Sequence, residues 1–318
     1  MLSNFRVAYL QLGRRGLRSR SFSVLSRNAT EIASVREHLR AFGSEQATDT
    51  VTLQLASESP SKELSKLGSS TAIITLKNPA SRNALTGKMM AELADVVDQL
   101  ETNPDFQRSL SSVIVRGDGG FFCAGADIRI AADHLLSKEG GKAMSTLMID
   151  SLTRLRHLPY VTVAAIEGGA VGGGAELATA TDYRVLDESA SIRFVQALMG
   201  VSPGWGGATR LVRLVGRGRA LELLGTASAC TARTCQEIGL VTQTLPVEEM
   251  DQWLVTKLEG FVHAHPQVLH AAKQVVAGCE DLPTFEEAIA NEHDVFLTLW
   301  DGEANRAALA AAKNKKKK

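Results

Sequence analysis

The sequence lacks the features that mark a membrane span, a disulfide scaffold or a metal-binding cluster. None of its apolar runs reaches the roughly 20 residues that a helix needs to cross a bilayer. It has only four cysteines in 318 residues, and they show neither CxxC pairing nor the spacing of a zinc site. We therefore expect these residues to be reduced thiols: Cys123, Cys230, Cys235 and Cys279.

An excess of charge of either sign is also missing. The chain carries 35 basic and 35 acidic side chains, so no global field would attract nucleic acid or a membrane surface. Aromatic residues make up 5% of the chain and are not interleaved with basic ones, which argues against RNA binding. The hydrophobic fraction of 44% is ordinary for a soluble globular protein, and the length predicts one large or two modest domains.

Acidic residues are absent from the first thirty positions, since the first of them is Glu31. The segment before it holds several serines and six arginines. This composition is typical of a mitochondrial transit peptide, although a disordered basic tail would share it. The other end is lysine-rich, with Lys315 to Lys318 closing the chain, and we expect it to be solvated.

Strand-like apolar runs alternate with helical spacing through the middle of the chain. Strands are expected at residues 71–76, 112–116, 160–166, 182–186 and 240–245. Helices are expected at residues 31–42, 89–100, 142–157, 173–181, 208–224 and in the region after 247. This alternation predicts an α/β fold with a mainly parallel sheet. We expect Ile114, Val163 and Ala165 to be nearly fully buried in it.

We divide the chain into four parts on this pattern. They are a transit-like or disordered segment (1–30), a polar N-terminal extension (31–68), a core (69–246) and a helical C-terminal region with the lysine-rich tail (247–318).

A glycine-rich segment, Glu167-Gly-Gly-Ala-Val-Gly-Gly-Gly-Ala-Glu176, follows an apolar strand and opens a helix. It matches neither the dinucleotide pattern GxGxxG nor the phosphate-binding loop, which needs a lysine. Glycines at a helix start let a ligand approach bare backbone N–H groups, which favour negative charge such as an oxyanion. Close packing of the helix on the sheet would require the same glycines.

Two further segments contain small residues after a strand or before a helix. The first is Phe121-Phe-Cys-Ala-Gly-Ala-Asp127. Either its small residues leave backbone N–H groups open to a ligand, or the segment is an ordinary tight turn in which Asp127 caps a helix. The second is Gly200-Val-Ser-Pro-Gly-Trp-Gly-Gly207, which predicts a turn followed by a helix. Its Trp205 either lines the acyl pocket or packs in the hydrophobic core.

Taken together and in this order, the segments resemble the crotonase (enoyl-CoA hydratase/isomerase) superfamily. Asn83-Ala-Leu precedes them, and Thr226-Ala-Ser-Ala-Cys-Thr-Ala and Ile238-Gly-Leu-Val-Thr follow, so the resemblance covers roughly residues 50–318. It implies a crotonase-like ββα superhelix (spiral) core with a helical C-terminal subdomain. It also implies an acyl-CoA substrate and a homotrimer or hexamer.

The resemblance also implies the site residues. In the family, two backbone N–H groups bind the thioester oxygen, and by position they are those of Ala126 and Gly173. Glu176 matches the first of two glutamates that hydratases use on a water, whereas the second falls on Gln196, which cannot act as a general base. The remaining predicted substrate-binding residues are Ala124, Gly125, Asp127, Gly172 and Trp205, with Gln196 among them as a pocket-lining amide.

Gln196 argues against hydration but leaves enolate chemistry in place. Ser191-Ile-Arg-Phe-Val and Met199-Gly-Val-Ser-Pro-Gly-Trp-Gly-Gly resemble the decarboxylases of this superfamily. The resemblance implies an acyl-CoA decarboxylase that removes CO₂ from a malonyl-type thioester, with Glu176 orienting the substrate or protonating the enolate. By resemblance it needs no metal or cofactor, because coenzyme A is part of the substrate, and we expect no nucleic-acid or membrane partner.

The alternatives are an enoyl-CoA hydratase/isomerase and an RNA-binding crotonase relative. The location stays open between cytosol, from the resemblance, and mitochondrial matrix, from the N-terminus.

Overall fold

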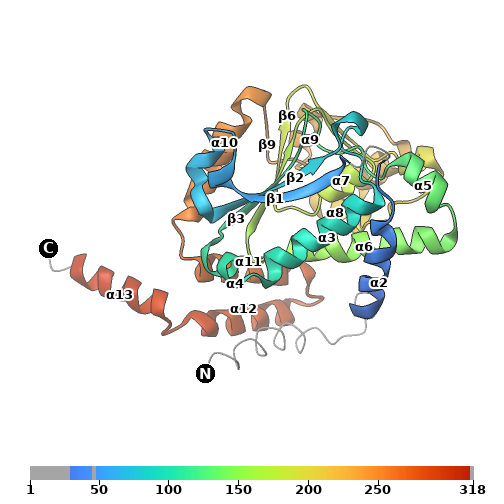
Figure 1. Cartoon of the computed structure of the whole chain (residues 1–318). Helices are drawn as coiled ribbons and strands as arrows, with labels where there is room; N and C mark the ends of the chain where they lie inside the picture. The colour runs from blue at the N-terminus through green and yellow to red at the C-terminus, as the bar shows by residue number, and fades with distance from the viewer. Residues whose placement is uncertain (1–28, 45–47, 316–318) are drawn as a thin grey trace. The chain divides into compact units, whose positions relative to one another are not determined.

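The computed structural model of the chain describes residues 29–44 and 48–315 (Figure 1). The transit-like segment and most of the lysine-rich tail lie outside the described residues, apart from their inner ends. Residues 32–266 form one compact unit, and residues 267–318 belong to a second. Among the described residues, no helix combines the length and the apolar character that crossing a membrane requires.

A six-stranded sheet lies at the centre of the larger unit. Its strand order is β1-β2-β3-β4-β6-β9, with β1 antiparallel to β2 and all other neighbours parallel. The strands are β1 (Thr50–Leu55), β2 (Thr71–Lys77), β3 (Ser112–Gly117), β4 (Val161–Ile166), β6 (Tyr183–Asp187) and β9 (Gln243–Leu245). All five predicted strands are present, with ends that differ by at most three residues, whereas β1 was not predicted.

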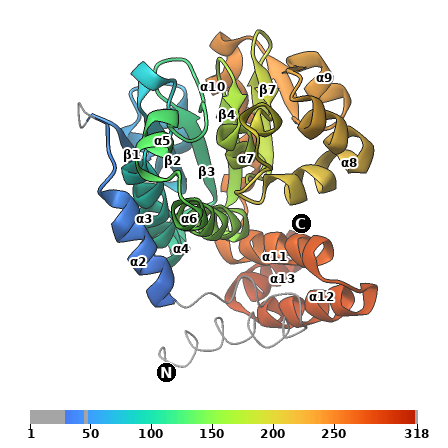
Figure 2. The ribbon, with the colours of Figure 1, turned by 90° about the vertical axis from the view of Figure 1, so that its right-hand side faces the viewer.

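Helices cover both faces of this sheet, as a mainly parallel sheet requires. The helices α3 (Gly87–Thr102) and α6 (Lys138–His157) pack against each other beside the sheet (Figure 2). Val113 and Val115 belong to the same core cluster as these helices, and Ile114 points to the opposite face because side chains alternate along a strand. On that face α10 (Met250–Val262) contacts β3 and the 3₁₀ segment η3 (Leu64–Ser70).

The predicted burial is confirmed: Ile114 and Val163 are fully buried, and Ala165 is 2% exposed. The compact unit extends beyond the 69–246 core on both sides. It takes in β1 from the polar extension, because β1 pairs with β2. It also takes in α10, because Leu254 and Leu258 are fully buried there.

A second, small sheet lies at the ends of the main strands. It contains β5 (Ala170–Val171), β7 (Ser191–Arg193) and β8 (Cys230–Thr231) in that order. Single parallel bridges, Cys123 with Ala170 and Leu85 with Ala126, continue the pairing toward the earlier segments. Several main strands are thus followed by a short second strand or bridge and then a helix, which is the predicted ββα spiral.

The other helices connect these layers or follow them. In the larger unit they are α2 (Ala29–Arg40) from Ile32 onward, α4 (Pro104–Ser109), α5 (Ile128–His134), α7 (Gly173–Ala178), α8 (Gly207–Thr226) and α9 (Ala232–Glu237). The short 3₁₀ segments are η2 (Ala56–Glu58), η4 (Pro79–Ser81), η5 (Gln196–Met199) and η6 (Val247–Glu249). The described C-terminal region is helical, as expected, with α11 (Pro266–Asp281), α12 (Phe285–Leu299) and α13 (Glu303–Lys315).

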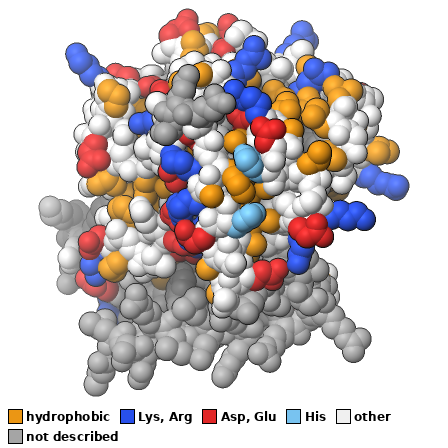
Figure 3. All heavy atoms as spheres, turned by 45° about the vertical axis from the view of Figure 1, so that its right-hand side comes forward, with side chains coloured by type: hydrophobic (Ala, Val, Ile, Leu, Met, Phe, Trp, Pro, Cys, Tyr) orange, Lys and Arg blue, Asp and Glu red, His pale blue; other side chains and the backbone are white. Residues whose placement is uncertain are grey.

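The face of the molecule in Figure 3 carries Lys and Arg side chains next to Asp and Glu side chains, with hydrophobic atoms between them. Neither sign of charge dominates this face. This agrees with the balanced composition of 35 basic and 35 acidic residues.

Candidate active site

Each of the three glycines at the start of α7 is required, either by its backbone conformation or by the close approach of another group. Gly172 has φ +55°, a left-handed conformation that favours glycine. A β-carbon at Gly173 would overlap the indole ring of Trp205, and one at Gly174 would overlap the carbonyl oxygen of Cys123. The packing explanation for this motif is therefore correct.

Gly173 is the first residue of α7, where a helical N–H has no partner within the helix. The neighbouring Gly172 N–H donates to the Arg193 carbonyl oxygen at 2.8 Å. The Gly173 N–H itself finds no acceptor among the residues that the structure describes. One of the two predicted donors is thus available.

Ala126 lies in a parallel bridge with Leu85. In that bridge the Leu85 N–H donates to the Gly125 carbonyl at 2.7 Å, and the Asp127 N–H donates to the Leu85 carbonyl at 2.9 Å. The N–H of Ala126 therefore points away from Leu85, toward the side on which Cys123 pairs with Ala170. Within residues 29–44 and 48–315 it has no acceptor either.

The two unpaired donors lie close together. A β-carbon placed on Gly125, the residue before Ala126, would be 2.8 Å from the Gly173 nitrogen and 2.9 Å from the Val171 carbonyl oxygen. A glycine at position 125, with φ +93°, is what allows this approach. The spiral thus brings together two backbone donors that are 47 positions apart in the sequence.

Glu176 lies one turn further along α7 and is 2% exposed. Its Oε1 accepts from Gln196 Nε2 at 2.9 Å and from the Gly204 N–H at 3.3 Å. Its Oε2 accepts from the backbone N–H groups of Trp205 and Gly207, each at 2.8 Å. Four donors on one carboxylate match its ionised form, which is an acceptor only. Glu176 thus holds the loop that carries Trp205.

Gln196 begins η5 and is 8% exposed. Its Nε2 faces Glu176, so the two positions that the sequence assigned to the hydratase glutamates do meet. Its Oε1 is buried and has no hydrogen-bond donor among the described residues. The preceding residue, Val195, borders the glycine turn, because a β-carbon at Gly172 would lie 3.2 Å from Val195 Cγ2.

Sequence reasoning missed Arg210, which is 6% exposed inside the same cluster. Its guanidinium donates to the carbonyl oxygens of Glu176 at 3.1 Å and Trp205 at 2.9 Å, and to Thr179 Oγ1 at 3.0 Å. Burial lowers the pKa of Arg210 to about 10, against the attraction of the Glu176 carboxylate. The only sequence signal was an arginine at the start of a predicted helix, which is more often exposed.

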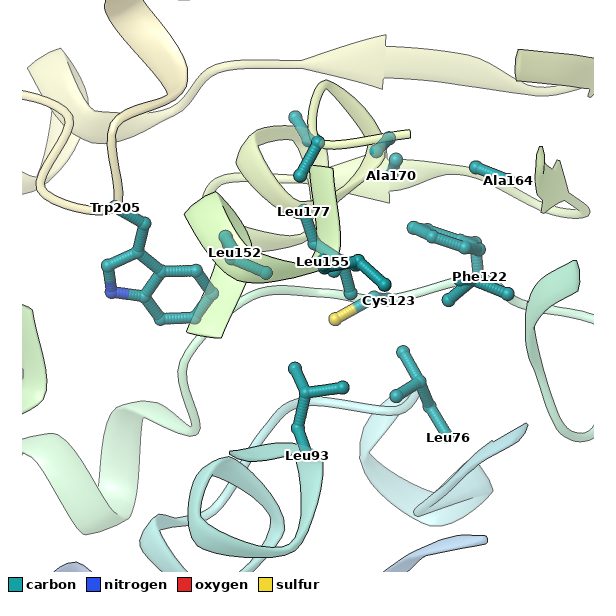
Figure 4. Packing of buried hydrophobic residues seen from close by; sticks show 14 of the residues in the cluster. Leu76, Leu93, Phe122, Cys123, Leu152, Leu155, Ala164, Ala170, Leu177 and Trp205 are labelled. Carbon is teal, nitrogen blue, oxygen red and sulfur yellow. The ribbon is translucent and has the colours of Figure 1, made fainter. Parts of the chain in front are cut away.

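The remaining predicted residues have local roles. The carboxylate of Asp127 caps α5 by accepting from the N–H groups of Arg129 and Ile130, at 2.9 and 3.3 Å. The Ala124 N–H donates to the Arg82 carbonyl at 3.0 Å. Trp205 is 3% exposed at the edge of the buried cluster that contains Cys123 and Leu177 (Figure 4). The capping alternative for Asp127 is therefore correct, and a role of Asp127 in binding stays a prediction.

Cys123 lies beside the donors without reactive character. Burial raises the pKa of its thiol to about 12, and its Sγ–H donates to the Asn83 carbonyl at 3.1 Å. Among the described residues, no three His, Cys, Asp or Glu side chains are grouped so that they could hold a metal ion. The polar groups that the structure brings together here are two unpaired backbone N–H groups and a buried carboxylate.

This fold and site define the class of protein. The chain belongs to the enoyl-CoA hydratase/isomerase family, whose profile matches residues 66–318. The predicted crotonase resemblance is thereby confirmed. Solved structures agree: an enoyl-CoA hydratase from Bacillus anthracis has a TM-score of 0.73 at 26% identity, covering 83% of this chain and 96% of that one. Pseudomonas aeruginosa DspI has a TM-score of 0.70 at 28% identity, covering 77% and 91%.

Within the family, the chain is similar to proteins named ethylmalonyl-CoA decarboxylase. The Gallus gallus protein is 41% identical over 253 residues, which are 77% of this chain and 82% of that protein. The Bos taurus protein is 37% identical over 255 residues, 78% of this chain and 80% of that protein.

Proposed function

We propose that this protein is an acyl-CoA decarboxylase that removes the free carboxylate of ethylmalonyl-CoA, with methylmalonyl-CoA as a second substrate. One observation carries the proposal: the site combines two backbone N–H groups without acceptors, those of Ala126 and Gly173, and has an amide, Gln196, where a hydratase has a second glutamate. The names of the relatives that are 37–41% identical support the substrate.

The donors act on the thioester carbonyl oxygen. When the bond between the α-carbon and the carboxylate breaks, its electron pair moves into the thioester as an enolate, and CO₂ leaves. The negative charge then lies on the oxygen that both N–H groups face. Loss of one such donor typically costs about 3 kcal/mol of transition-state stabilisation, or roughly a hundredfold in turnover. Because the thioester itself accepts the electrons, the proposed reaction needs no cofactor.

Hydration needs a group that takes a proton from water, and we propose that neither Gln196 nor Glu176 does so. Gln196 is an amide and has no such capacity. The Glu176 carboxylate is engaged by four donors, three of them backbone N–H groups. We assign Glu176 the role of fixing the loop of Trp205 and the amide of Gln196, in place of proton transfer to the enolate.

The test is incubation of the purified protein with a panel of acyl-CoA esters, followed by mass spectrometry. We expect loss of CO₂ from ethylmalonyl-CoA to give butyryl-CoA, slower loss from methylmalonyl-CoA, and no rapid water addition to crotonyl-CoA. Rapid hydration of crotonyl-CoA, with both malonyl-type esters untouched, would instead establish an enoyl-CoA hydratase. A salt-dependent RNA shift without any turnover would establish the RNA-binding alternative.

A further inference from the structure

The orientation of the Gln196 amide is fixed by Glu176. The ionised carboxylate accepts hydrogen bonds only, so it selects Nε2 of the amide, which lies 2.9 Å from Glu176 Oε1. A flipped amide would bring two oxygens together. The Oε1 atom of Gln196 is therefore forced to the edge of the amide that faces away from Glu176.

That oxygen is a buried acceptor without a donor. Gln196 is 8% exposed, and no donor among the described residues reaches its Oε1. A buried acceptor left unpaired is costly, so the position favours a ligand that donates a hydrogen bond. Gln196 is also close to the donors, because its Nε2 binds Glu176, one turn along α7 from Gly173, and the adjoining Val195 lies at the Gly172 turn. We infer from this that its Oε1 lies near the α-carbon of a bound substrate.

The proposed substrate supplies no such donor at its reacting end. The carboxylate, the thioester oxygen and the enolate are all acceptors. The small molecule that can donate to Oε1 and also to a neighbouring carbon is water. Each water has two O–H groups, so one can be held by Gln196 while the other points at the α-carbon.

We propose that Gln196 Oε1 holds the water that protonates the enolate after CO₂ has left, so that the proton reaches one face of the α-carbon. This inference rests on the proposed decarboxylation. The enolate electron pair forms the new C–H bond, the O–H bond of the water breaks, and the hydroxide formed takes a proton from solvent. The net change is a carboxylate and one proton converted into CO₂ and a C–H group. Because an amide cannot remove a proton, the held water is a proton donor and is not activated for attack.

The test uses ethylmalonyl-CoA in deuterated water and two separate readouts. The rate of CO₂ release reports C–C cleavage. The configuration of the butyryl-CoA, deuterated once at the α-carbon, reports protonation, and an acyl-CoA oxidase that removes one defined α-hydrogen reads it. We expect the wild-type protein to give one configuration in a ratio of about 10:1 or more. The variant Gln196→Leu should give about 1:1 while CO₂ release falls by less than about tenfold.

The matched control is Gln243→Leu, the same change in β9, where the glutamine Nε2 donates to the neighbouring Thr244 carbonyl at 2.9 Å. It should keep both the rate and the configuration. Gln196→Met, which preserves side-chain length, serves if the leucine variant does not fold, as judged by thermal unfolding.

A folded Gln196 variant that still gives a single configuration overturns the inference, and so does a wild-type product without a preferred configuration. Loss of CO₂ release in a folded variant overturns it as well, because protonation follows cleavage. If the wild-type protein releases no CO₂ from any malonyl-type ester, the proposed function has failed, and this inference fails with it.

Discussion

The indole ring of Trp205 occupies the space in which a side chain at position 173 would lie. The ring is kept there from two directions. The backbone N–H of Trp205 donates to the Glu176 carboxylate at 2.8 Å, and the backbone carbonyl of Trp205 accepts from Arg210 at 2.9 Å. The proposed donor Gly173, the ring above it, and the buried carboxylate and guanidinium therefore form one packed unit. A substitution at any of these residues is therefore expected to shift the position of the Gly173 N–H.

Gly173→Pro and Gly173→Ala together separate the donor from the packing. Both add a β-carbon that displaces the Trp205 ring, but only proline removes the N–H. If the N–H binds the enolate oxygen, turnover of ethylmalonyl-CoA by the proline variant should be about a hundredfold below that of the alanine variant. Steady-state kinetics measure this, with thermal unfolding to compare stability. Equal turnover in the two variants would show that the Gly173 N–H is not a catalytic donor.

Glu176→Gln should weaken the fold as well as the reaction. An amide presents an NH₂ group to some of the donors that now face carboxylate oxygens, so at least one buried N–H loses its acceptor. We expect the free energy of unfolding to fall by about 1–3 kcal/mol, as measured by urea denaturation. Glu188→Gln, at an exposed position, is the matched control and should change stability by less than about 0.5 kcal/mol. An unchanged stability in Glu176→Gln would contradict the anchoring role.

Arg210→Lys tests whether stability depends on the planar set of hydrogen bonds that the guanidinium makes or only on its positive charge. Lysine keeps the charge but cannot reach the carbonyls of Glu176 and Trp205 and the hydroxyl of Thr179 in the same planar arrangement. We expect a loss of about 1–3 kcal/mol of stability and a weaker apparent affinity for substrate. Because burial lowers the pKa of Arg210 only to about 10, Arg210 itself stays charged between about pH 6 and about pH 8 and adds no pH dependence to wild-type stability there. Urea denaturation measures the loss, and an unchanged stability in Arg210→Lys would show that the charge alone suffices.

The sequence pattern predicted the main sheet because its strands are buried on both faces and read as continuous apolar runs. It missed β1, where only Val51 is buried and the other positions are partly exposed. Its residues alternate between polar and apolar, so a search for continuous apolar runs does not find it.

The donors and the Glu176–Gln196 pair could be found from motif order, because each motif carries its own glycines or acid. Arg210 could not, since its burial depends on the Trp205 loop folding back onto α7. The lack of a donor on Gln196 Oε1 is likewise a property of the three-dimensional arrangement alone.

The first thirty residues are expected to direct location and to be dispensable for catalysis. They carry six arginines and no acidic residue, which we propose directs the chain to mitochondria. A fluorescent protein that carries residues 1–30 should co-localise with a mitochondrial marker. A chain that starts near Glu31 should keep full turnover. A diffuse cytosolic signal would reject the transit assignment and favour the cytosolic alternative.

Cys123 provides a test of the core beside the donors through alkaline pH. Its thiol has an ordinary pKa of 9.0, and burial raises that pKa to about 12 in the folded protein. Between these values the unfolded chain has lost the proton while the folded protein keeps it. The folded state then binds more protons than the unfolded state, so this residue makes stability fall as the pH rises from 9.0 toward about 12.

The slope from one thiol is at most about 1.4 kcal/mol per pH unit. Urea denaturation at about pH 8 and about pH 10.5 should therefore show a smaller alkaline loss of stability in Cys123→Ala than in the wild-type protein. Cys279→Ala, which changes an exposed cysteine, is the matched control and should keep the wild-type slope. Tyrosines and lysines also titrate in this range, but they are the same in all three proteins and cancel in the comparison. Identical slopes for Cys123→Ala and the wild-type protein would mean that solvent reaches this thiol, and the tight packing of Gly174 against Cys123 would then be wrong.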